Sequence, residues 1–287
     1  MKSVTPSTLI VLFFCFLGFV ACSDEEAPTQ SARTYNTTSD TESPADYGTA
    51  ESEANKVQDL VQAVYEELRA GISSENSVLP ECATVMFDTV LTPYSLVIDF
   101  GEDTCLCANW DGRYRKGKLI IAFIGRYRNS GSYYTVNSDQ YFVGENEHRI
   151  HHEVRNVGQN SQKQWVFEVD VSDTVITEKG LIQWQARRNR TWTAGANTPL
   201  EVMDDVYLIT DRNNRAAEGI NRTGQNFKVL IVKPIEVKIG CRYKLVSGVV
   251  SLTPNGGVER IIDYGNGVCD GKFTFTIRNQ SFSFDFG

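Results

Sequence analysis

The residues best suited to bind a ligand lie in one short segment, WQARRNRTW. If this segment is a β-strand, its side chains alternate, so Trp184, Arg188, Arg190 and Trp192 point to the same side. Aromatic rings and guanidinium groups on one surface stack sugars or bases and hold anions. The segments WDGRYRKGK and GRYRNSGSYY repeat the mixture. We therefore take these four residues as candidate ligand-binding residues. The alternative is that arginine, aromatic and acidic pairs stabilise an exposed sheet.

Other residue types that could do chemistry do not converge. The three histidines fall in HRIHHE, but on a strand His148 and His152 lie about 13 Å apart and His151 faces the other way. Asp99 and Asp263 each stand two residues before a glycine and are expected to hydrogen-bond their own turns. No HExxH helix, phosphate loop, nucleophile elbow or calcium loop is found in the sequence. We predict no catalytic residue, no metal site and no cofactor.

The elements that must carry these residues are β-strands. After Ser77, runs rich in Val, Ile, Tyr, Phe and Thr alternate with clusters of Gly, Asn, Asp and Ser, which is typical of strands and turns. No stretch suggests the long crossover helix that parallel strands need. We therefore predict an all-β domain over residues 77–287, an antiparallel meander of about ten to twelve strands. It could form an open curved sheet, a sandwich or a barrel.

One helix is expected ahead of the sheet, within residues 51–76. An apolar stripe at helical spacing includes Val57, Leu60, Val61 and Val64, and Gly71 stands where a C-terminal cap would lie. We expect this stripe to pack on the sheet. Residues 22–50 contain few large apolar side chains, so we predict a disordered tether there.

Charge is distributed unevenly along the chain. Residues 23–103 hold 17 acids and 3 bases, whereas residues 109–193 hold 13 bases and 9 acids. The tether and helix are therefore acidic, and the body of the domain is mildly basic. Because the formal net charge of the whole chain is −8 and no nucleic-acid-binding motif occurs, we do not expect nucleic acid as a partner.

Two distant segments share the same order of motifs around four cysteines. One runs from Cys82 to Cys105 and the other from Cys241 to Cys269, and each reads cysteine, Leu-Thr-Pro, Asp-aromatic-Gly, cysteine. This order suggests a repeated hairpin whose ends meet. We predict the disulfides Cys82–Cys105 and Cys241–Cys269, each stabilising the fold by about 3 kcal/mol. Cys107 is left over and could take the place of Cys105.

The N-terminus carries an export signal. An apolar run from Leu9 to Val20 has about a dozen residues, typical of a secretory signal and shorter than the roughly 20 of a membrane span. Ala21 provides a small residue before cleavage, and Cys22 resembles the acylated cysteine of the bacterial lipobox. We predict a signal peptide over residues 1–21 and membrane attachment through lipid on Cys22. An ordinary signal peptide with an incidental cysteine is the alternative.

The segment SDEE after Cys22 resembles the acidic export signal of surface lipoproteins in the Bacteroidota, and Ser23 resembles outer-membrane sorting in enterobacterial lipoproteins. Together with IDFG, IDYGNGVCDGK and RNRTWTAG, these features resemble a group of Bacteroidota lipoproteins, mostly without an assigned role, over most of the chain from Glu81 onward. The resemblance implies a lipid-anchored outer-membrane protein that faces outward, with a periplasm-facing protein as the alternative. It transfers no catalytic residue.

Three functions remain open. The leading hypothesis is a non-enzymatic surface module that binds a glycan or a protein partner on a β face. The second is an envelope carrier of lipid or another apolar ligand, which would need an apolar cavity of several hundred Å³. The third is a glycan hydrolase, which would need a wet cleft with two carboxylates about 5–9 Å apart.

Overall fold

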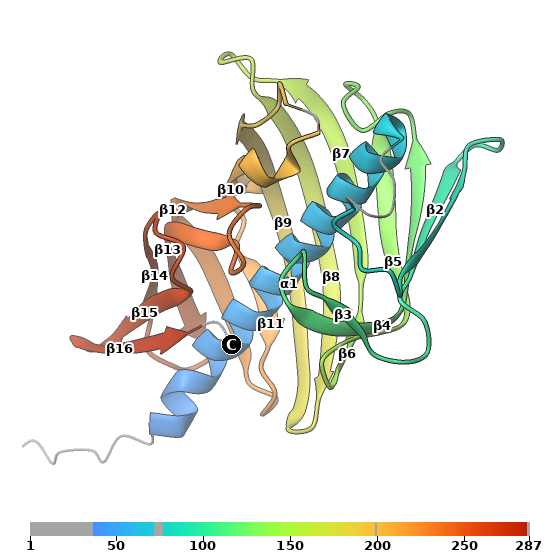
Figure 1. Cartoon of the computed structure of the whole chain (residues 1–287). Helices are drawn as coiled ribbons and strands as arrows, with labels where there is room; N and C mark the ends of the chain where they lie inside the picture. Colours follow the sequence, from blue (N-terminus) through green and yellow to red (C-terminus); the bar gives the residue numbers. More distant parts are fainter. Residues whose placement is uncertain (1–36, 72–76, 199, 286–287) are drawn as a thin grey trace, which may run out of the picture. The chain divides into compact units, whose positions relative to one another are not determined.

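One long helix and one antiparallel sheet of sixteen strands make up the described part of the chain (Figure 1). The computed structural model describes residues 37–71, 77–198 and 200–285. The predicted signal peptide, the proposed lipid site at Cys22 and the first part of the predicted tether lie outside these residues. The prediction of an antiparallel β meander with one N-terminal helix is confirmed.

The sheet has more strands than the sequence suggested, because long runs divide at bends. The segment HRIHHEVRNVG, for example, forms both β6 and β7. The first eight strands are β1 (Thr84–Asp88), β2 (Tyr94–Asp99), β3 (Cys105–Cys107), β4 (Arg113–Ile124), β5 (Tyr133–Val143), β6 (Asn146–Arg149), β7 (His151–Gln159) and β8 (Trp165–Thr177). The other eight are β9 (Gly180–Ala194), β10 (Val206–Asp211), β11 (Ala217–Ile220), β12 (Asn226–Lys238), β13 (Leu245–Pro254), β14 (Arg260–Asn266), β15 (Lys272–Ile277) and β16 (Gln280–Asp285).

Strand order follows the sequence closely. The main path of the sheet runs from β1 through β2, β4, β5, β6, β8, β9, β10, β12, β13, β14 and β15 to β16. The short strands β3, β7 and β11 pair beside this path, and two 3-10 turns, Val202–Asp204 and Arg212–Asn214, flank β10. β1 and β16 lie at opposite ends of this path. The sheet is therefore open, and it curves around the helix (Figure 1).

Helix α1 (Thr37–Ala70) begins earlier than predicted. The predicted stripe is buried, and the helix ends at Ala70, just before Gly71, which has a φ of 69°. The prediction that the tether extends to residue 50 is wrong for the described residues 37–50, which are helical. Some of their polar side chains are buried: Asp46 is 0% exposed and accepts hydrogen bonds from the backbone and side chain of Arg222. Composition misleads here because paired polar groups can be buried.

The interior of the curved sheet holds this helix through charge as well as apolar contact. Every residue from Ala50 to Glu67 is buried, so the face opposite the apolar stripe is also enclosed. Acidic side chains of α1 pair with arginines that come from separate parts of the sheet and its loops. These pairs are Asp46–Arg222, Glu51–Arg188, Glu53–Arg113, Asp59–Arg190 and Glu66–Arg128.

Both predicted disulfides are confirmed. Cys82–Cys105 and Cys241–Cys269 have Cα–Cα distances of 5.8 and 5.6 Å. Each closes a two-stranded hairpin, β1–β2 in the first segment and β13–β14 in the second. Cys107 is a free thiol, and its side chain is buried on the inner side of the sheet.

In each hairpin an aspartate holds the turn that leads to the second cysteine. The backbone N–H of Gly101 donates to Asp99 Oδ1 at 2.9 Å, and that of Gly265 donates to Asp263 Oδ1 at 2.8 Å. Both glycines have positive φ, 81° and 91°, which glycine adopts without steric cost. The prediction that these aspartates bond their own turns is confirmed.

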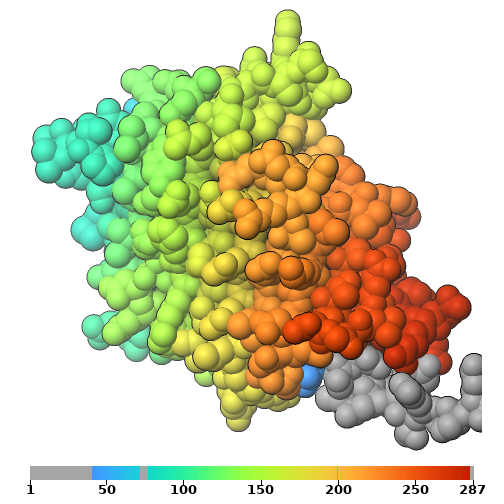
Figure 2. Space-filling view, turned by 180° about the vertical axis from the view of Figure 1, so that it is seen from behind, coloured from blue at the N-terminus to red at the C-terminus, as the bar shows by residue number. Residues whose placement is uncertain are grey.

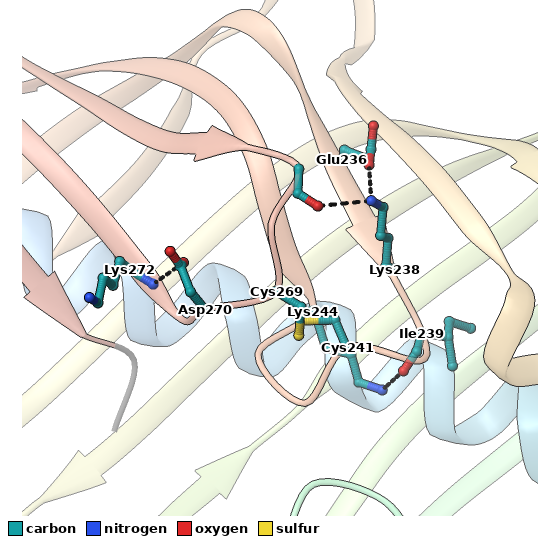
Figure 3. Close-up of a disulfide and its surroundings, with 9 residues drawn as sticks. Glu236, Lys238, Ile239, Cys241, Lys244, Cys269, Asp270 and Lys272 are labelled. Atoms are coloured by element: carbon teal, nitrogen blue, oxygen red, sulfur yellow. Dashed lines mark hydrogen bonds and ion pairs between the residues drawn. A yellow bond between two sulfur atoms is a disulfide. The ribbon is translucent and has the colours of Figure 1, made fainter.

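Two lysines flank the second disulfide in different ways (Figure 3). Lys238 is partly exposed, and its Nζ lies 3.2 Å from Glu236 Oε1 and 2.9 Å from the carbonyl oxygen of Gly267. Lys244 is fully buried; its Nζ donates to the carbonyl oxygen of Ile239 and lies 3.8 Å from the centre of the Trp110 ring. Burial lowers the pKa of Lys244 to about 8.

Candidate functional site

The four residues predicted to bind a ligand lie on one face of β9, as the alternation required, but that face is the inner one. Trp184, Arg188, Arg190 and Trp192 are each no more than 3% exposed. The prediction that they form an exposed binding surface is therefore wrong. They contact the chain's own helix and its neighbours instead.

The two arginines bind carboxylates of α1. Arg188 Nη2 lies 3.1 Å from Glu51 Oε2, and its Nη1 is ion-paired with Asp211. Arg190 is ion-paired with Asp59, and its guanidinium lies 3.8 Å from the centre of the Tyr207 ring. The anion-binding chemistry that the sequence predicted is thus present, and the anions are acidic residues of the helix.

The two tryptophans complete the same interface. The rings of Trp184 and Tyr47 of α1 have their centroids 5.2 Å apart. Trp192 donates its Nε1–H to Asp205 Oδ1 at 3.0 Å, and Gln62 of α1 donates to Oδ2 of the same carboxyl at 2.8 Å. Burial raises the pKa of Asp205 to about 7 in spite of these donors.

Little open space separates the helix from the sheet at this interface. The cavity bordered by α1, β8 and β9 has a volume of about 10 Å³, at the lower limit of what one water molecule needs. A carrier of apolar ligands was expected to show an apolar cavity of several hundred Å³. This cavity does not meet that expectation, because α1 fills the space.

The side chains of the histidine segment HRIHHE lie on both faces of the sheet. His148 and His152 are buried, and His151 on the opposite face is exposed. His152 Nε2 lies 2.8 Å from Asp173 Oδ2. Burial lowers the pKa of His148 to about 4. Among the described residues, no group of histidine, cysteine and acidic side chains is arranged to hold a metal ion.

Three open hollows lie on the outer, convex face of the sheet, the side of the molecule seen in Figure 2. One hollow of about 450 Å³ lies over β7, β8, β9 and β11. Its lining is mainly polar and charged, and it includes Glu153, Asp170, Ser172, Arg187 and Arg215. A volume of this size is within the range of small-ligand sites.

The charges in this hollow are ordered by strand register. Glu153 lies directly opposite Asp170, and Asp170 lies opposite Arg187. Carboxylates that face each other in this way repel one another. Here the repulsion is offset because Arg212 and Arg187 form ion pairs with Asp170.

A second hollow of about 540 Å³ adjoins the first. It lies over β11, β12 and β13 and shares Glu218 with the first hollow. Lys228 and Thr253 also line it. The two hollows together therefore extend across the convex face from β7 to β13.

A third hollow, of about 570 Å³, lies between β4 and β5. It follows from an irregularity in strand pairing: the register shifts between Lys116 and Lys118, where Gly117 lies against the backbone of Gln140. Lys118 is ion-paired with Asp99 at 3.1 Å, and Lys116 lies over the ring of Phe142. The cations of this hollow are thus already engaged by the protein.

Comparison with known proteins assigns no family or activity to the chain. No protein-family model matches it, and neither a curated protein nor a solved structure shows significant similarity. Within the described residues, no helix has the length and apolar character needed to cross a membrane.

Proposed function

We propose that this protein is a non-enzymatic binding module of the outer membrane, anchored by lipid on Cys22, and that it binds a glycan in the hollow over β7, β8, β9 and β11. The observation that carries the proposal is the contrast between the two faces of the sheet. The helix occupies the inner face, whereas the outer face has an open hollow of ligand size with a polar lining.

The chemistry of the lining favours a ligand rich in hydroxyl groups. Glu153 and Asp170 can accept hydrogen bonds, Arg187 can donate them, and Ser172 and Gln185 can do both. A sugar presents donors and acceptors on several sides, so it can satisfy such a lining. An apolar ligand would leave these groups without partners, which is unfavourable.

Hydrolysis has less support at the same place. Glu153 and Asp170 are direct cross-strand neighbours, so their Cβ atoms lie about 5 Å apart. Both side chains are nearly half exposed, at 46% and 42%, and Asp170 is already ion-paired with Arg212. A glycosidase requires one carboxyl that holds a proton for the leaving group, and an exposed carboxylate beside arginine is poorly suited to that role.

A glycan array tests the proposal. We expect the mature protein to bind a subset of glycans, and the variant Ser172→Trp, which fills the hollow, to lose that binding. Ser95→Trp is the matched control, because Ser95 is also an exposed serine on a strand but belongs to β2. If no glycan binds, or if both variants bind as well as the parent, the proposed site is wrong.

Attachment to the membrane needs its own experiment. We expect the Cys22→Ser variant to leave the membrane fraction, and mass spectrometry of the parent to find acyl chains on Cys22. Retention of the variant in the outer membrane would contradict the proposed anchor. Protease treatment of intact cells distinguishes an outward-facing protein from a periplasm-facing one.

A further inference from the structure

A row of outward-facing polar side chains connects the two adjoining hollows of the convex face. Ser172 pairs with Gln185, Gln185 with Glu218, Glu218 with Lys228, and Lys228 with Thr253. The row therefore crosses β8, β9, β11, β12 and β13 without interruption. At about 4.8 Å between strands, it is roughly 19 Å long, which is enough for several sugar rings in a line.

The row also joins the hollows physically, because Glu218 lines both of them. Glu218 Oε1 and Lys228 Nζ lie 3.3 Å apart, with both side chains at least 65% exposed. An ion pair this exposed contributes little to stability, so a ligand can separate the two groups at small cost. Each would then be free to bind a different part of the ligand.

The cation Arg215, at the edge of the row, has no ion-pair partner among the described residues. Asp170 and Glu168 are paired with Arg212, whereas Arg215, an exposed residue that lines the first hollow, forms no ion pair within the described part of the chain. A guanidinium group binds a carboxylate through two parallel hydrogen bonds. Arg215 is therefore a position where an acidic sugar would be distinguished from a neutral one.

From these observations we infer that the two hollows form one extended groove for a linear acidic oligosaccharide. The chain lies along the row from Ser172 to Thr253, and one of its carboxylates binds Arg215. This inference rests on the proposed function, since it specifies the ligand of the same site.

The test uses oligogalacturonates and hyaluronan oligomers of two and six sugars, with neutral cello-oligosaccharides of the same lengths. Binding to the mature protein is measured by calorimetry. We expect the acidic six-sugar chains to bind at least tenfold more tightly than the acidic two-sugar chains. We also expect them to bind at least tenfold more tightly than the neutral six-sugar chain. Thr253→Trp, which fills the second hollow, lowers the affinity for the six-sugar chains to that for the two-sugar chains.

Arg215→Gln separates charge from length. It lowers the affinity for the acidic chains about tenfold and does not change the affinity for the neutral chain. The groove is overturned if the parent binds short and long chains equally, or if Thr253→Trp keeps the parent's preference for long chains. It is also overturned if Arg215→Gln lowers the affinity for neutral and acidic chains by the same factor. In those cases the proposed function still stands, provided that Ser172→Trp abolishes binding. If Ser172→Trp has no effect, or if no oligosaccharide binds, the proposed function fails as well.

Discussion

Replacement of Arg190 by methionine tests how strongly the helix is held by its buried ion pairs. The Arg190 side chain is 3% exposed and that of Asp59, its partner on α1, is 0% exposed. Water therefore provides almost no screening for either charge. In Arg190→Met the Asp59 carboxylate stays inside the sheet with no cation bound to it.

The expected cost follows from this burial. Removal of one partner of a buried pair destabilises a protein by about 3–5 kcal/mol, because the remaining charge is desolvated and uncompensated. The contact of Arg190 with the Tyr207 ring is lost as well, although methionine retains part of the packing. We expect the free energy of unfolding to fall by about 4 kcal/mol, which lowers the melting temperature by about 10 °C for a domain of this size.

Urea unfolding followed by tryptophan fluorescence measures this change. The matched control is Arg187→Met, the same substitution on the same strand. Arg187 points outward, its side chain is 56% exposed, and it lies 3.8 Å from Asp170, so its loss should cost less than about 1 kcal/mol.

The double variant Asp59→Leu with Arg190→Met removes both charges of the pair, and we expect its free energy of unfolding to lie within about 1 kcal/mol of the parent's, because neither partner is left buried without the other. Equal stabilities for Arg190→Met and Arg187→Met would refute the reasoning. So would a double variant as unstable as Arg190→Met alone, since the uncompensated carboxylate could then not be the cause.

Three further outcomes are expected. Replacement of Cys241 and Cys269 by serine should lower the free energy of unfolding by about 3.5 kcal/mol; urea unfolding of the non-reduced proteins measures it, and an unchanged midpoint would contradict it. The pKa of Lys244 is about 8 in the folded state and roughly 10.4 in an unfolded chain. Between these values the native state binds fewer protons than the unfolded state, so the free energy of unfolding should rise with pH from about 8 to 10. Lys244→Met should remove that part of the pH dependence in unfolding titrations; an identical slope in the variant would be evidence against it. Gly219→Ala should cost about 1–3 kcal/mol, because its Cβ would lie 2.2 Å from the Phe227 ring, and a variant as stable as the parent would show that the ring moves freely.

Several local features could be predicted from the sequence because their causes are local. The turns at Asp99 and Asp263 and the end of α1 at Gly71 depend on residues within a few positions. The two disulfides followed from the similar order of motifs in two segments. Alternation also placed Trp184 and Arg188 correctly on one face of a strand.

The sequence did not show which face of β9 is buried. The face with Trp184, Ala186 and Trp192 is the more apolar of the two, and it does point inward. Arg188 and Arg190 on the same face favoured an exposed surface, because arginine is rarely buried without a partner. Their partners in α1, Glu51 and Asp59, are more than 100 positions away, and no local pattern identifies contacts at that separation.

The convex groove was beyond prediction for a related reason. Ser172 and Thr253 belong to the same row only because the register of five strands aligns them. A shift of one residue in any of these pairings would turn the following side chains to the other face. Register therefore determines the groove, and the sequence gives strand positions but not their alignment.

The uneven distribution of charge was the signal that could have located the helix. An apolar stripe alone permits α1 to slide along or turn within the sheet, since apolar contact has little directional preference. The carboxylates from Asp46 to Glu66 span about 30 Å of helix, and each pairs with an arginine fixed in the sheet or its loops. If α1 moved by one turn, it would break several of these pairs at once and leave their charges buried. We infer that these ion pairs specify a single position of α1, and that Arg188 and Arg190 are buried for this reason.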